Sequence, residues 1–278
     1  MSAYSGLLCY SQADVPRNQW FISALQRYAE PEGLSLRLCL AQEGIPAGFR
    51  PDFVLNRSRN AQIAEYCEET LGIPVFNSGD VTRITNDKYR THCFLRSAGL
   101  PTAETWCVSA DEPLPVLPMP LVAKPADGHG GAGVTWLADE QALAAYAASA
   151  KRPFLLQEPM VTGWDMRLYV LNGECLAAVL RSSQTDFRSN FSLGGHAESV
   201  TPDAEALQLL RRVQEILPLD FAGVDLLRRP GGGYVIGEIE DAVGCRMLYE
   251  LTYIDAAKEH IRTAAGILAG RITRGNST

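Results

Sequence analysis

Residues 221–246 read FAGVDLLRRPGGGYVIGEIEDAVGCR, and this stretch decides the fold. Two apolar runs, Phe221–Leu227 and Tyr234–Ile239, flank a turn of one proline and three glycines. This pattern is typical of a β-hairpin. We expect Gly231-Gly232 to form a two-residue loop, which sets the register of the two strands.

That register brings three carboxylates together. Asp225 faces Glu238, and Glu240 lies on the same strand face as Glu238 because side chains alternate along a strand. Two like charges ~4 Å apart repel by roughly 4 kcal/mol at an effective dielectric constant of about 20. Hard cations such as Mg²⁺, which bind carboxylates together with substrate phosphates, relieve such crowding. From this stretch alone two interpretations stay open: a metal site, or an edge hairpin whose acids point into water.

The composition is that of an ordinary soluble protein. The 278 residues suffice for one large or two moderate domains, and the net charge of −7 comes without a basic block. This argues against a general nucleic-acid or anionic-membrane binder. No apolar run reaches the roughly 18 residues of a membrane-spanning helix. The seven cysteines form no CxxC pair, which suggests reduced thiols in a cytoplasmic protein.

The first 84 residues alternate apolar runs of strand and helix length, which predicts a small, open, mostly parallel sheet. Ligands of such sheets bind beyond the carboxyl ends of the strands. The third strand runs into the loop 56–60, where Arg57 and Arg59 either hold a substrate carboxylate or are solvated. We expect strands at Gly6–Tyr10, Leu34–Leu40, Asp52–Leu55 and Ile73–Phe76, and helices at Asn18–Ala29 and Ala61–Leu71.

A glycine-rich loop follows the expected strand 121–124. Gly128, Gly130 and Gly133 satisfy G-x-G-x-x-G, but the β-like residues 134–137 follow where a dinucleotide-binding fold needs a helix. A strand–loop–strand unit instead predicts a flap whose backbone N–H groups cover phosphates. Lys124 supplies a cation to them in this interpretation, and is a solvated lysine in the alternative one.

The remaining pattern mixes hairpins and helices. Asn172-Gly173 is a strong turn signal between two strands. A proline-rich linker at 113–120 indicates the start of a subdomain. We expect strands at Phe154–Glu158, Asp165–Leu171 and Glu174–Arg181, and helices at Asn86–Leu95, Pro202–Leu217 and Met247–Leu268.

Several short motifs occur in a fixed order along the chain. They are Asn86-Asp87-Lys88, Lys124 with its glycine flap, Gln157-Glu158, Gly163-x-Asp165-x-Arg167, Asp186-Phe187-Arg188-Ser189-Asn190 with Gly194-Gly195, Ala222-Gly223-Val224-Asp225, and Glu238. This ordered set resembles the ATP-grasp superfamily, and within it the RimK-type carboxylate–amine ligases. The resemblance implies an α/β (α+β) ATP-grasp fold. A small βαβ pre-ATP-grasp domain (1–84) would contribute to substrate binding, and a two-lobed ATP-grasp domain (85–278) would carry a mobile lid at about 115–160.

The resemblance also implies roles for individual residues. Glu158 and Pro159 would form the adenine hinge, with Met160 supplying the N–H that proline lacks, and Asp165 would hold the ribose. Asp225, Glu238 and Glu240 would bind two Mg²⁺ ions, with Mn²⁺ as an alternative. The full set of nucleotide-binding residues would be Lys88, Lys124, Gly128, Gly130, Gly131, Gln157, Glu158, Pro159, Met160, Asp165, Arg167 and Ser189. The catalytic residues would be Arg181, Arg188 and Asn190.

One departure from the family pattern concerns the end of the hairpin. The family usually has Glu-x-Asn followed by Ser-Pro-Gly, whereas this chain has EIEDAVGCR at 238–246. Glu240 still offers oxygen ligands. The missing Pro-Gly turn leaves substrate choice open, because the nucleophile-binding loop of the family begins there. Arg246 either binds an acceptor carboxylate or pairs with Asp241.

The activity that these residues imply is an ATP- and Mg²⁺-dependent C–N ligase. It would join an amino acid or small peptide to an amine through an acyl phosphate, releasing ADP and phosphate. The alternatives are a non-catalytic ATP-binding regulator and an ATP-grasp kinase on the same scaffold. The resemblance further suggests a homodimer or homotetramer.

Overall fold

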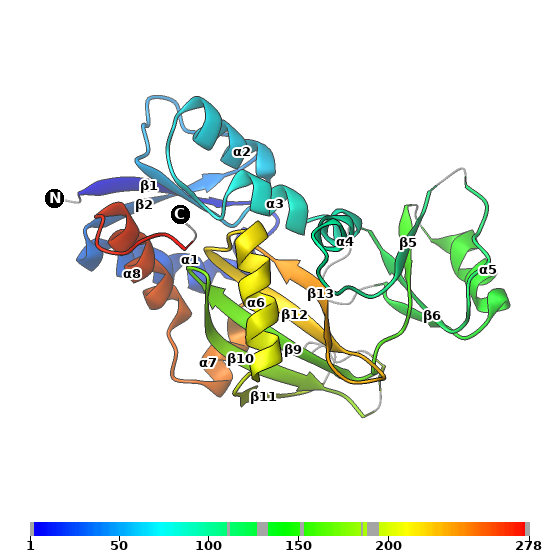
Figure 1. Ribbon diagram of the computed structural model, residues 1–278. Coiled ribbons are helices and arrows are strands. Elements are labelled where there is room, and N and C mark those ends of the chain that lie inside the picture. The colour runs from blue at the N-terminus through cyan, green and yellow to red at the C-terminus, as the bar shows by residue number, and fades with distance from the viewer. Residues whose placement is uncertain are drawn as a thin grey trace.

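The structure is a computed structural model that describes residues 3–109, 112–126, 133–150, 153–184, 186–187 and 195–275. Its strands form three sheets, ordered β2-β1-β3-β4, β11-β10-β9-β12-β13 and β5-β8-β6-β7. The five-stranded sheet lies between the other two, and the sheet that contains β5 and β6 projects to one side with α5 (Figure 1). Within the described ranges, no helix is long and apolar enough to cross a membrane.

The first sheet is parallel throughout, as the alternation of strands and helices predicted. β2 and β3 both pair with β1, and β4 pairs with β3. The predicted helix 61–71 begins at Ala61 but continues from Tyr66 as a π-type turn. The elements are β1 (Tyr4–Tyr10), α1 (Val15–Ala29), the 3-10 turn η1 (Glu30–Glu32), β2 (Leu34–Leu40), β3 (Phe53–Asn56), α2 (Ala61–Glu65), η2 (Tyr66–Thr70) and β4 (Val75–Phe76).

The central sheet is antiparallel and carries α6 on one face (Figure 1). The helix packs there because its apolar stripe, which includes Leu210 and Val213, meets Leu168 and Val224 of the sheet. The prediction missed β11, whose residues show weak alternation. The elements are β9 (Trp164–Leu171), β10 (Glu174–Ser182), β11 (His196–Val200), α6 (Ala204–Ile216), β12 (Phe221–Arg228) and β13 (Tyr234–Glu240).

The hairpin β12-β13 confirms the facing pairs but not the turn. Asp225 opposes Glu238, as predicted, and Gly223 opposes Glu240. The expected two-residue loop is wrong, because Arg228 opposes Tyr234 and the chain therefore turns through one more residue. A register shift between Asp225 and Leu226 restores the predicted pairing, which is how a β-bulge acts.

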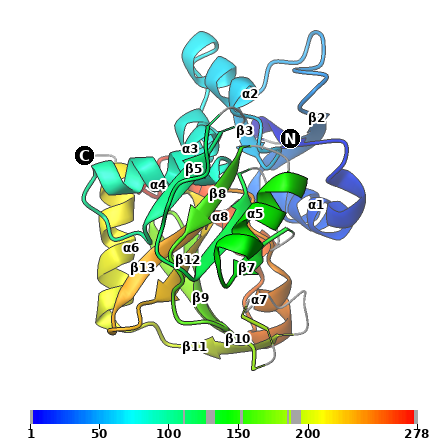
Figure 2. The same ribbon diagram turned by 90° about the vertical axis from the view of Figure 1, so that its right-hand side faces the viewer.

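The third sheet forms a separate lobe beyond α4 (Figure 1), and Figure 2 shows this lobe facing the viewer. It includes β5, a strand that the sequence analysis missed, so the lobe begins earlier than the predicted lid boundary of about 115. Motion of this lobe stays a prediction. Two helices, α3 (Gly79–Thr85) and α4 (Lys88–Ser97), precede the lobe in the chain. The lobe itself contains β5 (Thr105–Val108), β6 (Leu121–Pro125), β7 (Thr135–Leu137), α5 (Glu140–Ser149) and β8 (Phe154–Gln157).

The predicted closing helix 247–268 is wrong in one respect, because it is two helices, α7 (Arg246–Leu251) and α8 (Ala256–Leu268). Thr252 has an extended backbone and ends α7. Asp255 caps α8 by accepting from the N–H of Lys258, and its carboxylate also accepts from two tyrosine hydroxyls. Tertiary contacts therefore break a segment whose apolar spacing alone favours one helix.

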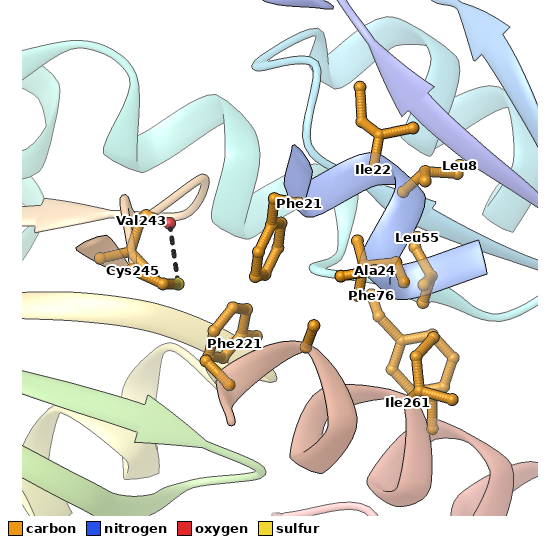
Figure 3. Close-up of a cluster of buried hydrophobic side chains, with 14 of the residues drawn as sticks. Leu8, Phe21, Ile22, Ala24, Leu55, Phe76, Phe221, Val243, Cys245 and Ile261 are labelled. Carbon is orange, nitrogen blue, oxygen red and sulfur yellow. Dashed lines mark hydrogen bonds between the residues drawn. The ribbon is translucent and has the colours of Figure 1, made fainter. Parts of the chain in front are cut away.

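The first and central sheets share one hydrophobic core. Phe21 of α1 lies against Phe221 of β12, close to Val243 (Figure 3). Asn77 links the same two parts through its buried side chain. Its amide nitrogen donates to the carbonyls of Phe221 and Asp241 at 2.8 and 2.9 Å, and its oxygen accepts from two backbone N–H groups of β12 and the residue before it. The polar end of β13 is thus fixed to the N-terminal part of the chain.

Candidate active site

Two cavities meet at the β12-β13 hairpin. The larger, of about 680 Å³, lies between the N-terminal sheet and the segment 238–250. The smaller, of about 170 Å³, lies between the third sheet and the central sheet. Glu238 lines both. A group bound in one cavity is therefore next to a group bound in the other.

The smaller cavity collects most of the predicted nucleotide-binding residues within the described part of the chain. β6 and β8 supply one wall, and β9, β10 and the hairpin supply the other. Trp136 and Phe187 add an aromatic pair whose ring centres are 5.8 Å apart, and the sequence analysis gave neither a role. The predicted residues that line it are Lys88, Lys124, Gln157, Glu158, Pro159, Met160, Asp165, Arg181, Asp225 and Glu238.

Lys124 is a cation with a neutral partner. Its Nζ donates to Oε1 of Gln157 at 2.9 Å. Burial and, to a smaller extent, the positive charge of Lys88 lower the pKa of Lys124 to about 8, and the negative charge of Glu238 opposes this shift. Two ammonium groups that repel each other at a desolvated site favour binding of an anion between them. A polyphosphate is such an anion.

The carboxylates of the hairpin are balanced by basic side chains. Arg167 binds both oxygens of Asp225 at 2.7 Å, and its third nitrogen lies 3.0 Å from Glu240. Arg181 donates to the same Asp225 at 2.7 Å and to Asp165. Burial alone would raise the pKa of Asp225, but Arg167 and Arg181 hold that pKa well below its usual range.

The facing of Asp225 and Glu238 is therefore confirmed, and basic side chains balance these carboxylates in the structure. Lys88 pairs with Glu238. Within the described ranges, no group of three or more His, Cys, Asp or Glu side chains is placed to hold a metal ion. Glu238 and Glu240 still fit as hard oxygen ligands, since each contacts one basic side chain and phosphate oxygens can complete a Mg²⁺ shell. The assignment of Asp225, Glu238 and Glu240 to metal stays a prediction, and Asp225 is the least available of the three.

Arg167 lies behind this patch. Its ion pairs with Asp225 and Glu240 make it a support for the carboxylates, and it is not among the residues that line the smaller cavity. Its predicted contact with nucleotide stays untested. The predicted residues Gly128, Gly130, Gly131, Arg188, Ser189 and Asn190 lie outside the described residues.

All three arginines predicted to bind substrate line the larger cavity. Arg57 is buried, donating from Nε to the Tyr10 hydroxyl at 2.8 Å and from Nη2 to the Val243 carbonyl at 2.7 Å. Arg59 lies 3.6 Å from Asp14. Arg246 is exposed at the start of α7.

The loop that replaces the Pro-Gly turn is held by side chains from distant elements. The carbonyl of Asp241 accepts from Asn77, that of Val243 from Arg57, and that of Gly244 from Tyr169 at 3.1 Å. Asp241 is buried, and its Oδ1 accepts from Asn86 at 3.0 Å. Its pairing with Arg246, one of the two predicted alternatives, is therefore not found.

The comparisons with known proteins agree with this architecture. A RimK-like ATP-grasp domain model matches residues 85–264. The chain belongs to this family. The predicted RimK-type membership and ATP-grasp fold are thus confirmed.

Among sequence relatives of this RimK-like chain, human β-citrylglutamate synthase B is 30% identical over 220 residues, which is 74% of this chain. The chain covers only 57% of that protein's length. A probable α-L-glutamate ligase of Haemophilus influenzae is 28% identical over 203 residues, 69% of this chain and 67% of that protein. The glutamate–LysW ligase ArgX of Sulfurisphaera tokodaii is 26% identical over 239 residues, covering 79% and 85%.

Solved structures share the whole fold at low identity. A D-alanine–D-alanine ligase of Bacillus anthracis superposes with a TM-score of 0.74 at 15% identity, covering 97% of this chain and 99% of that one. The D-cycloserine synthetase DcsG gives 0.69 at 18% identity, covering 95% and 99%. The fold of this chain, including its N-terminal sheet, is therefore that of these solved structures.

Proposed function

We propose that this chain is an ATP- and Mg²⁺-dependent carboxylate–amine ligase that acts on an amino acid or small peptide. The observation that carries the proposal is the pair of cavities that share Glu238. One has the basic residues and strand hinge expected for a nucleotide, and the other has arginines from the N-terminal sheet. The names of the relatives, which include glutamate ligases and a D-alanine–D-alanine ligase, support the same class.

The chemistry follows in two steps. A substrate carboxylate attacks the γ-phosphate of ATP, which gives an acyl phosphate and ADP. An amine then attacks the acyl carbon and displaces phosphate, which gives the amide. The first step brings two anions together, so electrostatic stabilisation dominates the barrier.

Residues of this chain supply that stabilisation. Lys124, half-buried beside neutral Gln157, would bind the phosphates together with Lys88. Arg181, which binds Asp165 and Asp225, would stabilise the oxyanion of the second step. Glu238 and Glu240, with Asp225, would hold Mg²⁺, which when bound neutralises charge on the phosphates. Segment 157–160 would carry the adenine, and Arg188 and Asn190 would contact the transferred phosphoryl group.

Turnover and trapping together test the proposal. Purified protein with ATP and Mg²⁺ is incubated with a panel of amino acids and dipeptides, and ADP release is measured. Hydroxylamine converts an acyl phosphate into a hydroxamate, which mass spectrometry detects. ADP release that requires a carboxylate and yields a hydroxamate supports the ligase. Binding of ATP without turnover on any substrate would favour the regulator, and a stable phosphorylated product that no amine consumes would favour the kinase.

Three further assignments belong to the proposal. The division at residue 84, the mobile lid and a homodimer or homotetramer are expected by family resemblance. A cytoplasmic location is consistent with seven free cysteines in the described residues. Gel filtration with light scattering measures the oligomer.

A further inference from the structure

Arg57 is a buried cation whose polar partners are all neutral. The side chain is 5% exposed and lines the larger cavity. It donates to a hydroxyl and a carbonyl, and no carboxylate of the described residues forms an ion pair with it. The rings of Phe21 and Phe221, which face each other in Figure 3, lie 4.9 and 5.5 Å from its guanidinium carbon. Aromatic faces offset only part of the cost of burying a charge, so the site favours an anionic ligand group.

The other arginines of this cavity differ from Arg57. Arg17 pairs with Asp14, and Arg59 lies 3.6 Å from the same carboxylate. Arg246 is exposed, so water solvates its charge. The buried carboxylate of Asp241 also lines this cavity, but it accepts from Asn86 and forms no ion pair with Arg57. Arg57 is therefore the buried arginine of this cavity that no carboxylate of the described residues pairs with, which points to one desolvated carboxylate of a ligand.

An aromatic wall lies on the same cavity. Trp20 is 59% exposed although it is a large apolar side chain, and its ring meets the ring of Tyr249 edge-to-face at 4.7 Å. Tyr249 is held in place because its hydroxyl donates to Asp255 and accepts from the N–H of Ala257, both at 2.9 Å. A fixed and open aromatic surface at a cavity rim favours an apolar group of the ligand.

We propose that the larger cavity binds a monocarboxylate with an apolar side chain, its carboxylate on Arg57 and its side chain against Trp20 and Tyr249. The inference rests on the proposed ligase function and names the substrate class of that site. Arg57 does not line the cavity of Lys88 and Lys124, so the carboxylate it holds is not the one that reacts with ATP. The ligand is then the amine substrate, an apolar amino acid with a free carboxylate. Several relatives are instead named for glutamate, which has two carboxylates.

Calorimetry with three achiral probes tests this, so that the handedness of the true substrate does not matter. 3-Phenylpropanoate has the carboxylate and the ring, 3-phenylpropanamide lacks the charge, and glutarate replaces the ring by a second carboxylate. We expect 3-phenylpropanoate to bind at least about tenfold more tightly than either, because a charge-assisted hydrogen bond and an aromatic contact are each worth about that factor. Equal or tighter binding of glutarate or of the amide, or no binding of 3-phenylpropanoate at millimolar concentration, overturns the proposal.

Binding of the same probes to variants tests which side chain contacts the carboxylate and which contacts the ring. Trp20→Ala, at an exposed position that folding tolerates, should weaken 3-phenylpropanoate roughly tenfold and leave glutarate unchanged. Arg57→Lys, which keeps the charge, should bind weakly, and Arg57→Met should remove the preference for the carboxylate over the amide. Arg17→Met, an arginine of the same cavity that already pairs with Asp14, is the control and should bind like the parent. Thermal melting confirms that each variant is folded. A weakening by Arg17→Met as large as that by Arg57→Met would contradict the assignment.

The outcome separates this inference from the proposed function. ADP release that depends only on acidic amino acids would leave the ligase intact and refute the apolar site. Binding of 3-phenylpropanoate with no ADP release on any carboxylate would support the apolar site and refute the ligase.

Discussion

Replacing Arg167 by methionine should destabilise the folded chain by roughly 3–5 kcal/mol, because it leaves a buried carboxylate with too few partners. Arg167 makes two hydrogen bonds of 2.7 Å to Asp225 and an ion pair of 3.0 Å to Glu240. Methionine keeps the apolar stem but donates nothing. Asp225 then keeps one 2.7 Å bond from Arg181, although its carboxylate stays buried.

Urea unfolding at pH 7 without nucleotide measures this loss, with tryptophan fluorescence and circular dichroism as independent probes. Arg96→Met is the matched control, because Arg96 pairs with Glu104 at 2.8 Å but the two side chains are 58% and 49% exposed. An exposed pair contributes about 0–1 kcal/mol. Equal destabilisation by the two variants would refute the reasoning that burial makes the Arg167 pair costly to break.

A second change identifies the cause. If the loss comes from the stranded charge of Asp225, then adding Asp225→Asn to Arg167→Met should recover part of the stability, since a neutral amide costs less to bury than a carboxylate. The alternative is that the two changes act independently. In that case the losses of unfolding free energy caused by Arg167→Met and by Asp225→Asn would simply add in the double variant.

Three other changes test separate parts of the site. The dissociation constant for ATP should rise as pH increases above about 8, the pKa to which burial and Lys88 lower Lys124, because neutral Lys124 attracts phosphate less. In Lys124→Gln, ATP affinity should fall by roughly 10- to 100-fold at pH 7 and lose that pH dependence; parallel pH profiles would contradict the role of this lysine. Glu238→Gln should abolish ADP formation while the melting temperature stays close to that of the parent, and near-normal turnover would count against its predicted metal and phosphate role. Asn77→Ala should cost roughly 2–4 kcal/mol in urea unfolding, because four buried backbone groups lose their partner; a loss under about 1 kcal/mol would show that water replaces the amide.

Local rules predicted the features that depend on neighbours in sequence. The alternation of side chains placed Glu238 and Glu240 on one face, and the facing of Asp225 and Glu238 holds in the structure. The turn is one residue longer than predicted, and the β-bulge between Asp225 and Leu226 restores the predicted pairing. The pairing was therefore predicted correctly although the turn was not. The start of α4 after Asp87 likewise follows from a local cap.

Features that depend on distant partners could not be predicted. The loop 241–245 has no turn signature because Asn77, Arg57 and Tyr169 hold its carbonyls, and these residues are remote in sequence. The break between α7 and α8 depends on Asp255, whose carboxylate accepts from the hydroxyls of Tyr28 and Tyr249. The choice of arginines as the counter-charges of Asp225 also needed the sheet order β10-β9-β12, which no single hairpin reveals.

The balance of charge at the hairpin relates the resting protein to the proposed catalyst. Glu240 and Asp225 are paired with arginines from β9 and β10, which belong to the same rigid sheet, whereas Glu238 pairs with Lys88 at the start of α4. Lys88 is thus the basic partner that can leave without breaking a bidentate contact. If Glu238 binds Mg²⁺ as predicted, the metal takes the place of Lys88, and the freed ammonium group lies beside Lys124 in the cavity proposed for the phosphates. Metal and nucleotide are then coupled through one lysine, because each makes the site more favourable for the other.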